Sequence, residues 1–171
     1  MSERRAIKVR RARRSDAGEF ARLVKQLALY EKLTPPDASQ IDRLIDDGFG
    51  RKKKYSLIMA FCEGKAAGYA VYFMTYSTFL AKQTLYLEDL FVDGPYRRQG
   101  IGSLLFSELL KIATANGCGR MEWMVLSWND AAISFYKALG AEQLDGWKTY
   151  RLVSDRFREA AKIARSSKPG H

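Results

Sequence analysis

Two arginines, a glutamine and two glycines form a segment that could bind an anion. The segment 97–102 reads RRQGIG, and it lies between residues 85–92, which are apolar apart from two acids, and leucines and isoleucines that recur at helical spacing. The start of a helix leaves backbone N–H groups without partners and carries a partial positive charge, which suits phosphate. Gly100 and Gly102 would let phosphate approach the main chain, beside the charged arginines. The alternative is a tight turn whose glycines serve backbone geometry and whose arginines are only solvated.

Two familiar phosphate loops do not match this segment. A P-loop needs lysine followed by serine or threonine after its last glycine, whereas Ser103 follows Gly102 directly. A dinucleotide-binding fingerprint needs its third glycine where Leu105 stands and opens directly off its strand, whereas seven residues separate Val92 from Gly100. Both loop types are therefore excluded.

The sequence restricts acid and base catalysis to carboxyl, phenol, lysine and cysteine groups. Its one histidine is the last residue, His171, so a Ser-His-Asp triad, a Cys-His pair and a histidine-ligated metal are excluded unless the tail folds back. Glu88 is the candidate base, because desolvation in the apolar segment 85–92 would raise its proton affinity. The alternative is a strand-edge acid paired with a basic side chain. Asp89 would face the opposite way in a regular strand, but not in a bulged one.

Six blocks resemble the Gcn5-related N-acetyltransferases (GNAT), above all their diamine (spermidine/spermine) branch. RRQGIG fits the family's acetyl-CoA signature, which is Gln or Arg, two residues, Gly, one residue, then Gly or Ala. The blocks keep the order and spacing of that branch: LALYEKL at 27–33, DDGFG at 46–50, YLEDLFV at 86–92, RRQGIGS at 97–103, WNDAAISFYKALGA at 128–141 and GWKTYRL at 146–152. The resemblance implies one α/β domain of the GNAT fold over residues 1–171, with frayed basic ends at 1–5 and 166–171. Its sheet is expected to be mixed, mostly antiparallel and twisted, with helices on both faces.

The resemblance also implies the catalytic residues. Glu88 matches the glutamate thought to draw a proton off the amine through water. An alkylammonium has a pKa near 10.4, so forming the free amine at pH 7 costs about 4.6 kcal/mol, which a base lowers. Tyr136 matches the general acid, and we expect it to hydrogen-bond the sulfur as charge develops, because a phenol holds its proton more tightly than a thiol. The alternative for Tyr136 is simple packing.

The coenzyme is expected to be acetyl-CoA, with no metal. A backbone N–H at Leu90 or nearby would bind the negative charge that develops on the carbonyl oxygen. Asn129 would contact the coenzyme as well as capping a helix. The residues expected to contact acetyl-CoA are Leu90, Phe91, Val92, Arg97, Arg98, Gln99, Gly100, Ile101, Gly102, Ser103, Asn129 and Ala132.

The resemblance defines the acceptor site less well. Tyr30 and Glu31 match positions that touch the amine in the family, although a helix end with a surface acid explains them equally well. Ser77 and Ser127 stand where diamine enzymes carry acids, which weakens the case for a long polycation. The residues expected to bind one ammonium group are Tyr30, Glu31, Glu88, Trp123 and Trp147, with Asp145 as a further acid. The tryptophans would act by cation–π contact unless they belong to the core.

The apolar patterns predict alternating strands and helices, and hence an α/β fold. The expected strands are 7–10, 56–62, 66–76, 84–92, 121–126 and 147–153. The expected helices begin at Ser15 as N-cap, at Ser39, after the segment 97–103, which we call the glycine loop, at Asn129 as N-cap and at Ser154. The turn 63–65 predicts a hairpin, so the sheet is mixed.

The net charge of +10 lies at the two ends of this chain of 171 residues. Residues 1–14 and 151–171 carry the whole excess, so residues 15–150 have no net charge to attract nucleic acid. Cys62 and Cys118 show no metal-ligand spacing, which favours a reduced, cytoplasmic chain. No segment has the length and apolar character of a membrane span, and no secretory signal precedes the first strand.

We therefore predict an acetyl-CoA-dependent N-acetyltransferase that acetylates a primary amine of a small molecule by direct attack. The expected acceptor is a diamine, a polyamine or an amino acid such as lysine or thialysine, and the expected assembly is a homodimer, as in the relatives. Neither cysteine lies in a matching block, which argues against an acetyl-enzyme. The alternatives are acetylation of a protein lysine or N-terminus, and a non-catalytic CoA-binding module, against which the presence of both Glu88 and Tyr136 argues.

Overall fold

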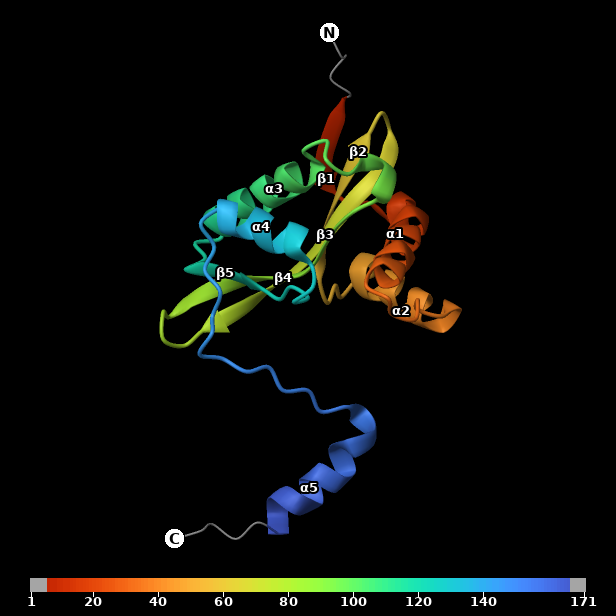
Figure 1. The fold of residues 1–171 in the computed structure, drawn as a ribbon. Coiled ribbons are helices and arrows are strands. Elements are labelled where there is room, and N and C mark those ends of the chain that lie inside the picture. The colour runs from red at the N-terminus through yellow and green to blue at the C-terminus, as the bar shows by residue number, and fades with distance from the viewer. Residues whose placement is uncertain (1–5, 167–171) are drawn as a thin grey trace. The chain divides into compact units, whose positions relative to one another are not determined.

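A five-stranded sheet organises the first part of the chain (Figure 1). The computed structural model describes residues 6–166. The strands lie side by side in chain order, and the first four are antiparallel, whereas the last pair is parallel. They are β1 (Ile7–Arg11), β2 (Ser56–Cys62), β3 (Lys65–Ser77), β4 (Lys82–Val92) and β5 (Arg120–Trp123). The predicted mixed, mostly antiparallel sheet is confirmed.

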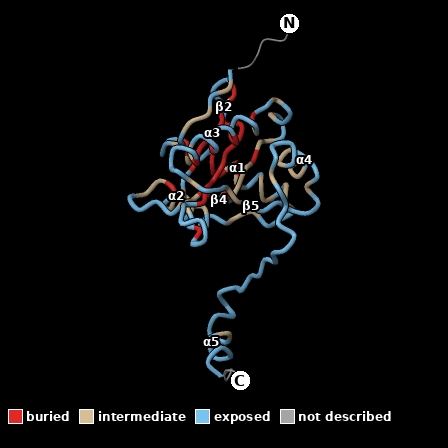
Figure 2. The backbone as a smooth tube through the Cα atoms, turned by 90° about the vertical axis from the view of Figure 1, so that its left-hand side faces the viewer, coloured by how far each residue is buried: buried red, intermediate tan, exposed pale blue. Residues whose placement is uncertain are grey.

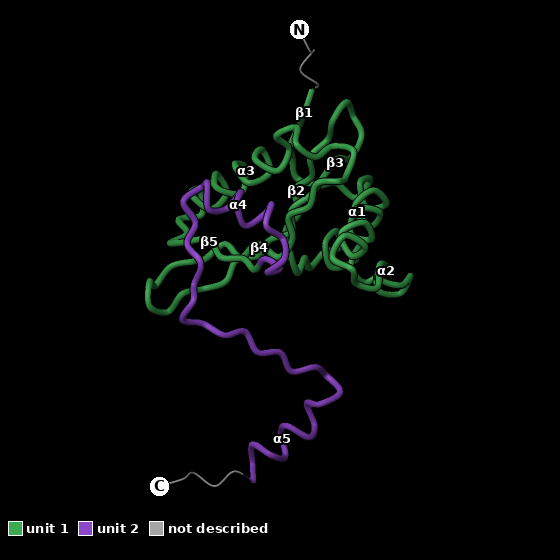
Figure 3. The backbone as a smooth tube through the Cα atoms, viewed as in Figure 1, with its two compact units in different colours: residues 1–124 green, residues 125–171 purple. Residues whose placement is uncertain are grey.

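The chain divides into two compact units, residues 1–124 and residues 125–171 (Figure 3). The expectation that residues 1–171 form one domain stays a prediction. Of the expected frayed ends, residues 1–5 and 167–171 lie outside the described part, while Ser166 ends a helix. None of the helices between residues 6 and 166 is long and apolar enough to cross a membrane.

Two helices of the first unit belong to one side of its sheet, α1 (Ala17–Tyr30) and α2 (Ala38–Phe49). Phe20 and Leu23 of α1 are fully buried against the strands, and the ring of Phe20 meets Tyr69 of β3 edge-on at 5.1 Å. Figure 2 shows the buried residues gathered on the strands and the helices packed against them. Apolar burial of this kind is the main stabilising contribution to the unit.

The opposite face of the sheet is covered by α3 (Ile101–Ala115), through Ile101, Leu105 and Leu109. A Cβ placed on Gly68 would meet Leu105 at 3.4 Å, whereas the adjacent Tyr69 packs on α1. Adjacent residues of a strand point to opposite faces, so α1 and α3 lie on opposite sides of the sheet. The predicted helices on both faces are confirmed.

The first helix begins differently from the prediction. A 3-10 turn, η1 (Arg14–Asp16), precedes α1, and Asp16 rather than Ser15 is its N-cap residue. The carboxylate of Asp16 accepts hydrogen bonds from Arg10 at 2.7 and 3.0 Å and from the backbone N–H of Arg13 at 2.6 Å. These donors precede the helix, and the side chain of Asp16 makes no cap hydrogen bond to α1. The helix starts later than predicted because the 3-10 turn η1 occupies Arg14–Asp16.

The second unit contains α4 (Asp130–Ala138) and α5 (Phe157–Ser166), the latter preceded by the 3-10 turn η3 (Ser154–Arg156). Asn129 caps α4 as predicted, since its side chain accepts a hydrogen bond from the N–H of Ala132 at 3.3 Å. The strand predicted for residues 147–153 is wrong, because the described residues supply no strand that pairs with it. The strand predicted to end at residue 126 ends at Trp123, where its pairing with β4 stops at Leu87.

Candidate active site

A β-bulge in β4 places two acids on one face of the sheet. Val71 of β3 lies opposite Asp89, whereas Tyr72 lies opposite Leu87, so Glu88 has no counterpart on β3. Directly opposite residues share a face, and adjacent residues alternate. Asp89 therefore shares the α1 face with Val71, and Glu88, next to Leu87 on the other face, joins it there. The sequence left open whether this strand is regular or bulged, and the structure shows the bulged form.

Asp89 is less exposed than Glu88. It is partly buried, and its Oδ2 accepts a hydrogen bond from the hydroxyl of the fully buried Tyr69 at 3.2 Å. Burial, followed by the negative charge of Glu88, raises the pKa of Asp89 to about 6, and the charge of Glu31 adds to this against the opposing hydrogen bond from Tyr69. A carboxyl that titrates near neutral pH suits proton transfer and the binding of a cation.

The end of α1 supplies a third acid to the same region. Glu31 follows the last residue of α1, and burial raises the pKa of its carboxyl. Its charge also raises the pKa values of Asp89 and Tyr69. We define Glu31, Glu88 and Asp89 as the acidic cluster. The charges of Glu31 and Glu88 both raise the pKa of Asp89, and a cation bound among the three carboxyl groups would offset this repulsion.

The edge of β4 is open next to the acidic cluster. Strand β5 pairs with β4 only from Thr84 to Leu87, whereas β4 continues to Val92, and no strand within residues 6–166 pairs with that edge beyond Leu87. The N–H of Asp93 donates to Ala67 on the β3 side at 2.9 Å. Because successive N–H groups of a strand alternate in direction, those of Leu90 and Val92 point to the open edge.

The glycine loop leads from this strand to the start of α3. Gly100 is the N-cap residue at φ +80°, with no side-chain cap, and the first helical hydrogen bond runs from the N–H of Leu104 to its carbonyl at 3.0 Å. The N–H groups of Ile101, Gly102 and Ser103 therefore precede the helical ladder and suit an anion. A Cβ on Gly102 would touch only Val92, at 3.8 Å, so internal packing does not require glycine there. Close approach of a ligand to the backbone would require it.

Arg97 of this loop contacts α1 as well as β4. Its Nε donates to the carbonyl of Val92 at 2.9 Å, and its guanidinium lies over the ring of Tyr30, 4.2 Å from the centroid. The side chain of Arg98 is exposed, at a backbone φ of +59°. Gln99 donates from Nε2 to the carbonyl of Pro95 at 3.1 Å, within the loop. Arg97 therefore connects Val92, which is expected at the coenzyme site, to Tyr30, which is expected at the acceptor site.

Sequence comparison assigns the chain to a family on most of its length. Residues 20–141 match the Acetyltransferase (GNAT) family. The chain belongs to this family. It is 36% identical over 166 residues to thialysine N-epsilon-acetyltransferase of Bos taurus, covering 91% of this chain and 97% of that protein. It is 32% identical to the human spermidine/spermine N(1)-acetyltransferase-like protein 1, covering 91% of this chain and 24% of that protein. The resemblance to the diamine branch is confirmed.

The fold agrees with a solved structure as well. An integron cassette protein from the mobile metagenome of V. cholerae superposes with a TM-score of 0.76 at 25% identity, covering 91% of this chain and 98% of that protein. The predicted GNAT fold is therefore confirmed. The relatives are named acetyltransferases, which confirms the predicted class of enzyme.

The second unit of this GNAT chain holds the other predicted site residues. Burial raises the pKa of Tyr136 on α4 to about 12, so its phenol keeps its proton at neutral pH. Asn129 and Ala132 form the N-terminal cap of α4. Trp147 lies in the irregular segment that follows, with 78% of its surface exposed. The roles of these residues stay predictions.

The structure does not place every residue predicted for the acceptor site near the acidic cluster. Trp123 does not join the acidic cluster, because its ring meets Phe106 of α3 edge-on at 5.4 Å, on the opposite face of the sheet. Ser77 is buried, and its hydroxyl accepts a hydrogen bond from the N–H of Leu80 at 3.2 Å, which fixes the turn between β3 and β4. The sequence analysis did not identify Tyr69 or assign a role to Asp89. The only available signal was the adjacent acid pair at positions 88 and 89, since the Tyr69 contact joins residues far apart in sequence.

Proposed function

We propose that the chain transfers the acetyl group of acetyl-CoA directly to a primary amine of a small molecule. The observation that carries this proposal is the single strand β4, whose open edge runs from the acidic cluster to the glycine loop. A thioester bound along this edge would place its acetyl end at the acids and its phosphates at the start of α3. The amine and the coenzyme would therefore meet on one element of the fold.

Backbone N–H groups along the open edge of β4 and at the start of α3 could bind the coenzyme. The N–H groups that precede the ladder of α3, from Ile101 to Ser103, would hold the pyrophosphate, with Arg98 adding charge. The open-edge N–H of Val92 would pair with the pantetheine arm, and that of Leu90 would stabilise negative charge on the carbonyl oxygen. We also propose that Asn129 and Ala132 contact the coenzyme.

The acidic cluster supports an acceptor that is a primary ammonium before reaction. Glu31, Glu88 and Asp89 provide enough charge for one ammonium group. A lysine-like or thialysine-like amino acid, or one end of a diamine, fits this better than a long polycation, whose second charge would need further acids. The names of the relatives support the same class of amine.

The reaction needs one proton acceptor and one proton donor. The amine nitrogen attacks the thioester carbon, the carbon–sulfur bond breaks, and the sulfur leaves with the bond's electron pair. Asp89, with its pKa of about 6, or Glu88 takes the proton that the ammonium loses to become the free amine. The second proton, which the nitrogen loses after attack, passes to the departing sulfur. Tyr136 stays protonated, and we propose that it donates a hydrogen bond to the sulfur as negative charge develops there.

A panel of amines tests the proposed function. Release of free thiol from acetyl-CoA is measured with thialysine, lysine, diamines, spermidine and an unrelated peptide as acceptors. We expect the highest kcat/KM for acceptors with one primary ammonium near the reacting end. Preference for the peptide would favour a protein acetyltransferase, and binding of CoA without turnover on any amine would favour the non-catalytic module. The cytoplasmic location and the homodimer stay predictions, the latter testable by light scattering.

Valine at position 102 is expected to block the coenzyme without unfolding the chain. A Cβ at this position would make only an ordinary van der Waals contact within the protein, 3.8 Å from Val92. A branched side chain would nevertheless fill the space through which a ligand approaches the backbone N–H groups. We expect Gly102→Val to weaken CoA binding at least about 30-fold, equivalent to the loss of about 2 kcal/mol from one or two charge-assisted hydrogen bonds. Calorimetry measures the affinity, and circular dichroism checks the fold. The exposed Gly18→Ala, whose Cβ meets nothing within 4 Å, is the control.

A further inference from the structure

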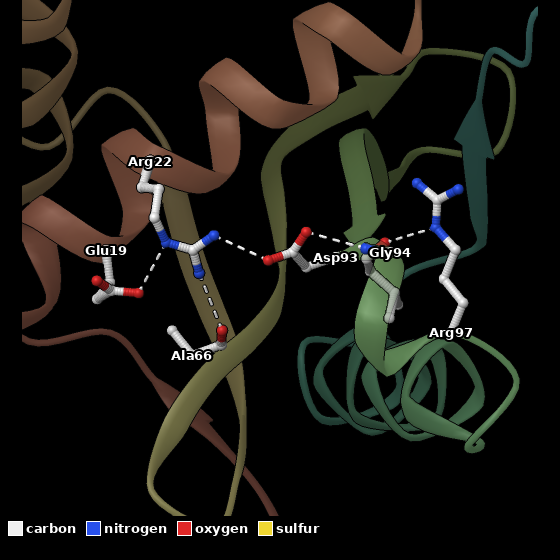
Figure 4. A network of polar contacts seen from close by, with 7 residues as sticks. Glu19, Arg22, Ala66, Asp93, Gly94 and Arg97 are labelled. Atoms are coloured by element: carbon white, nitrogen blue, oxygen red, sulfur yellow. Dashed lines mark hydrogen bonds and ion pairs between the residues drawn. The ribbon is translucent and has the colours of Figure 1, made fainter.

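An arginine on α1 is joined to the residue that follows β4 (Figure 4). Arg22 Nη1 donates to Asp93 Oδ2 at 2.8 Å, and its Nη2 donates to the carbonyl of Ala66 at 3.2 Å. Its Nε donates to Glu19 on the same helix at 3.0 Å. All three nitrogens of the guanidinium are therefore used, which fixes the plane of the group and the carboxylate that it meets.

Asp93, whose carboxylate is held by Arg22, also makes hydrogen bonds to the turn that follows. Its side chain has only 16% of its surface exposed, and while Oδ2 meets Arg22, Oδ1 accepts a hydrogen bond from the N–H of Gly94 at 2.9 Å. Its backbone carbonyl accepts from the N–H of Tyr96 at 2.9 Å, which closes the 3-10 turn η2 (Gly94–Tyr96). One carboxylate thus connects helix α1 to the first residue of the segment that becomes the glycine loop.

The glycine loop is held at a second point on the same helix. Arg97, directly after η2, stacks on Tyr30 and donates to Val92, as described above. Arg22 and Tyr30 lie about two helical turns apart on α1. The segment 93–97 is therefore fixed to α1 at both of its ends, and the next residues supply the N–H groups proposed to bind pyrophosphate.

We propose that Arg22 and Asp93 position the glycine loop for acetyl-CoA. This inference rests on the proposed function and assigns a role to two residues that touch neither the coenzyme nor the amine. Anion binding by backbone N–H groups depends on their direction, so a shift in η2 would reduce coenzyme affinity while leaving the acidic cluster unchanged. Arg22 and Asp93 are positioning residues.

The surroundings of the pair distinguish positioning from simple stability. The side chain of Arg22 is 40% exposed, and the pair lines a surface hollow with Glu19, Lys65 and Tyr96. Asp93 is more enclosed, but the exposed side of the arginine gives water access to the pair, which limits its contribution to folding. Removing the pair should therefore change coenzyme binding more than the melting temperature.

The test compares matched variants of the full-length chain. Asp93→Asn removes the charge but keeps an oxygen that can accept from the N–H of Gly94, and Arg22→Gln removes the partner charge. We expect each variant to raise the Kd for CoA and the KM for acetyl-CoA about tenfold, with the KM of the amine and kcat at saturating coenzyme within about twofold of the wild type. The double variant should bind CoA about as well as the weaker single variant, because both remove one interaction.

Glu19→Gln is the control, since it removes the other acid on Arg22 and leaves the contact with Asp93. Its Kd for CoA should stay within about twofold of the wild type. Should Arg22→Gln fail to fold, Arg22→Lys keeps the charge without the fork and should give an intermediate loss of affinity. Two results would overturn this inference without affecting the proposed function. One is an unchanged Kd for CoA in folded Asp93→Asn and Arg22→Lys, and the other is a rise in the KM of the amine as large as that in the KM of acetyl-CoA. A wild-type chain that binds no CoA would reject the proposed function together with it.

Discussion

Asparagine at position 89 is expected to lower kcat/KM for the amine about a hundredfold at pH 7.5. Asp89 has a pKa of about 6, so the wild type should lose activity as pH falls through 6, when its carboxylate becomes protonated. General bases typically contribute about 10² to 10⁴ in rate. Asp89→Asn cannot titrate, so the acidic limb of the profile of kcat/KM against pH should disappear together with most of the activity.

The same substitution is expected to stabilise the chain above pH 6. The pKa of Asp89 is raised from 3.8 to about 6, so the folded state holds this proton more tightly than the unfolded state. Its favourable contribution is full below about pH 4 and is lost as pH rises through 6. Roughly two pKa units at 1.36 kcal/mol each give an upper limit of about 3 kcal/mol. Chemical denaturation should show Asp89→Asn gaining stability relative to the wild type between pH 4 and pH 7.

Two further variants make this prediction specific. Asp42→Asn, on the exposed surface of α2, should change neither the pH profile nor the stability difference. Glu88→Gln should keep an acidic limb if Asp89 is the base, and it should shift that limb to lower pH, because the charge of Glu88 raises the pKa of Asp89. Retention of the limb near pH 6 in Asp89→Asn would refute the role proposed for that residue.

Phenylalanine at position 136 is expected to reduce kcat by about 10² to 10³ while leaving the Kd for CoA within about twofold. The pKa of Tyr136, raised by burial to about 12, keeps the phenol protonated over the working range of pH. A hydrogen bond made only as charge develops on sulfur lowers the barrier without strengthening ground-state binding. Single-turnover kinetics at saturating acetyl-CoA measure the chemical step.

Tyr150→Phe is the matched control for this variant. The residue lies in the same unit with 88% of its surface exposed, and the same hydroxyl is removed. We expect kcat to be unchanged in Tyr150→Phe. An acyl donor with a better leaving group, such as a thioester of an acidic thiol, should restore much of the rate to Tyr136→Phe. A normal kcat in Tyr136→Phe would show that the phenol packs without catalysing.

Local sequence patterns predicted most of the first unit. The strand 56–62 lies at the predicted positions, and the glycine loop precedes a helix that begins at Ile101. Capping of α4 by Asn129 was predicted as well, because a cap depends on residues only three positions apart. These features follow from apolar periodicity and turn chemistry, which act over a few neighbouring residues.

Features that depend on pairing between distant segments were not predictable in this way. The strand expected at 147–153 has suitable residues, but a strand forms only where another strand accepts its hydrogen bonds, and the described chain supplies none. Ser15 was the expected cap, but Asp16 makes the contacts with Arg10 and Arg13, which depend on where β1 ends.

The sequence alone determined the family, the glycine loop ahead of α3 and the presence of a carboxylate in β4, because each is carried by contiguous residues. Only the tertiary structure decided that Glu88 and Asp89 share a face, since the register between β3 and β4 creates the bulge. It also decided that Tyr69 lies against Asp89 and that Arg22 holds Asp93, 71 positions further along the chain. Such contacts arise when the sheet and α1 pack together, and no short-range pattern encodes them.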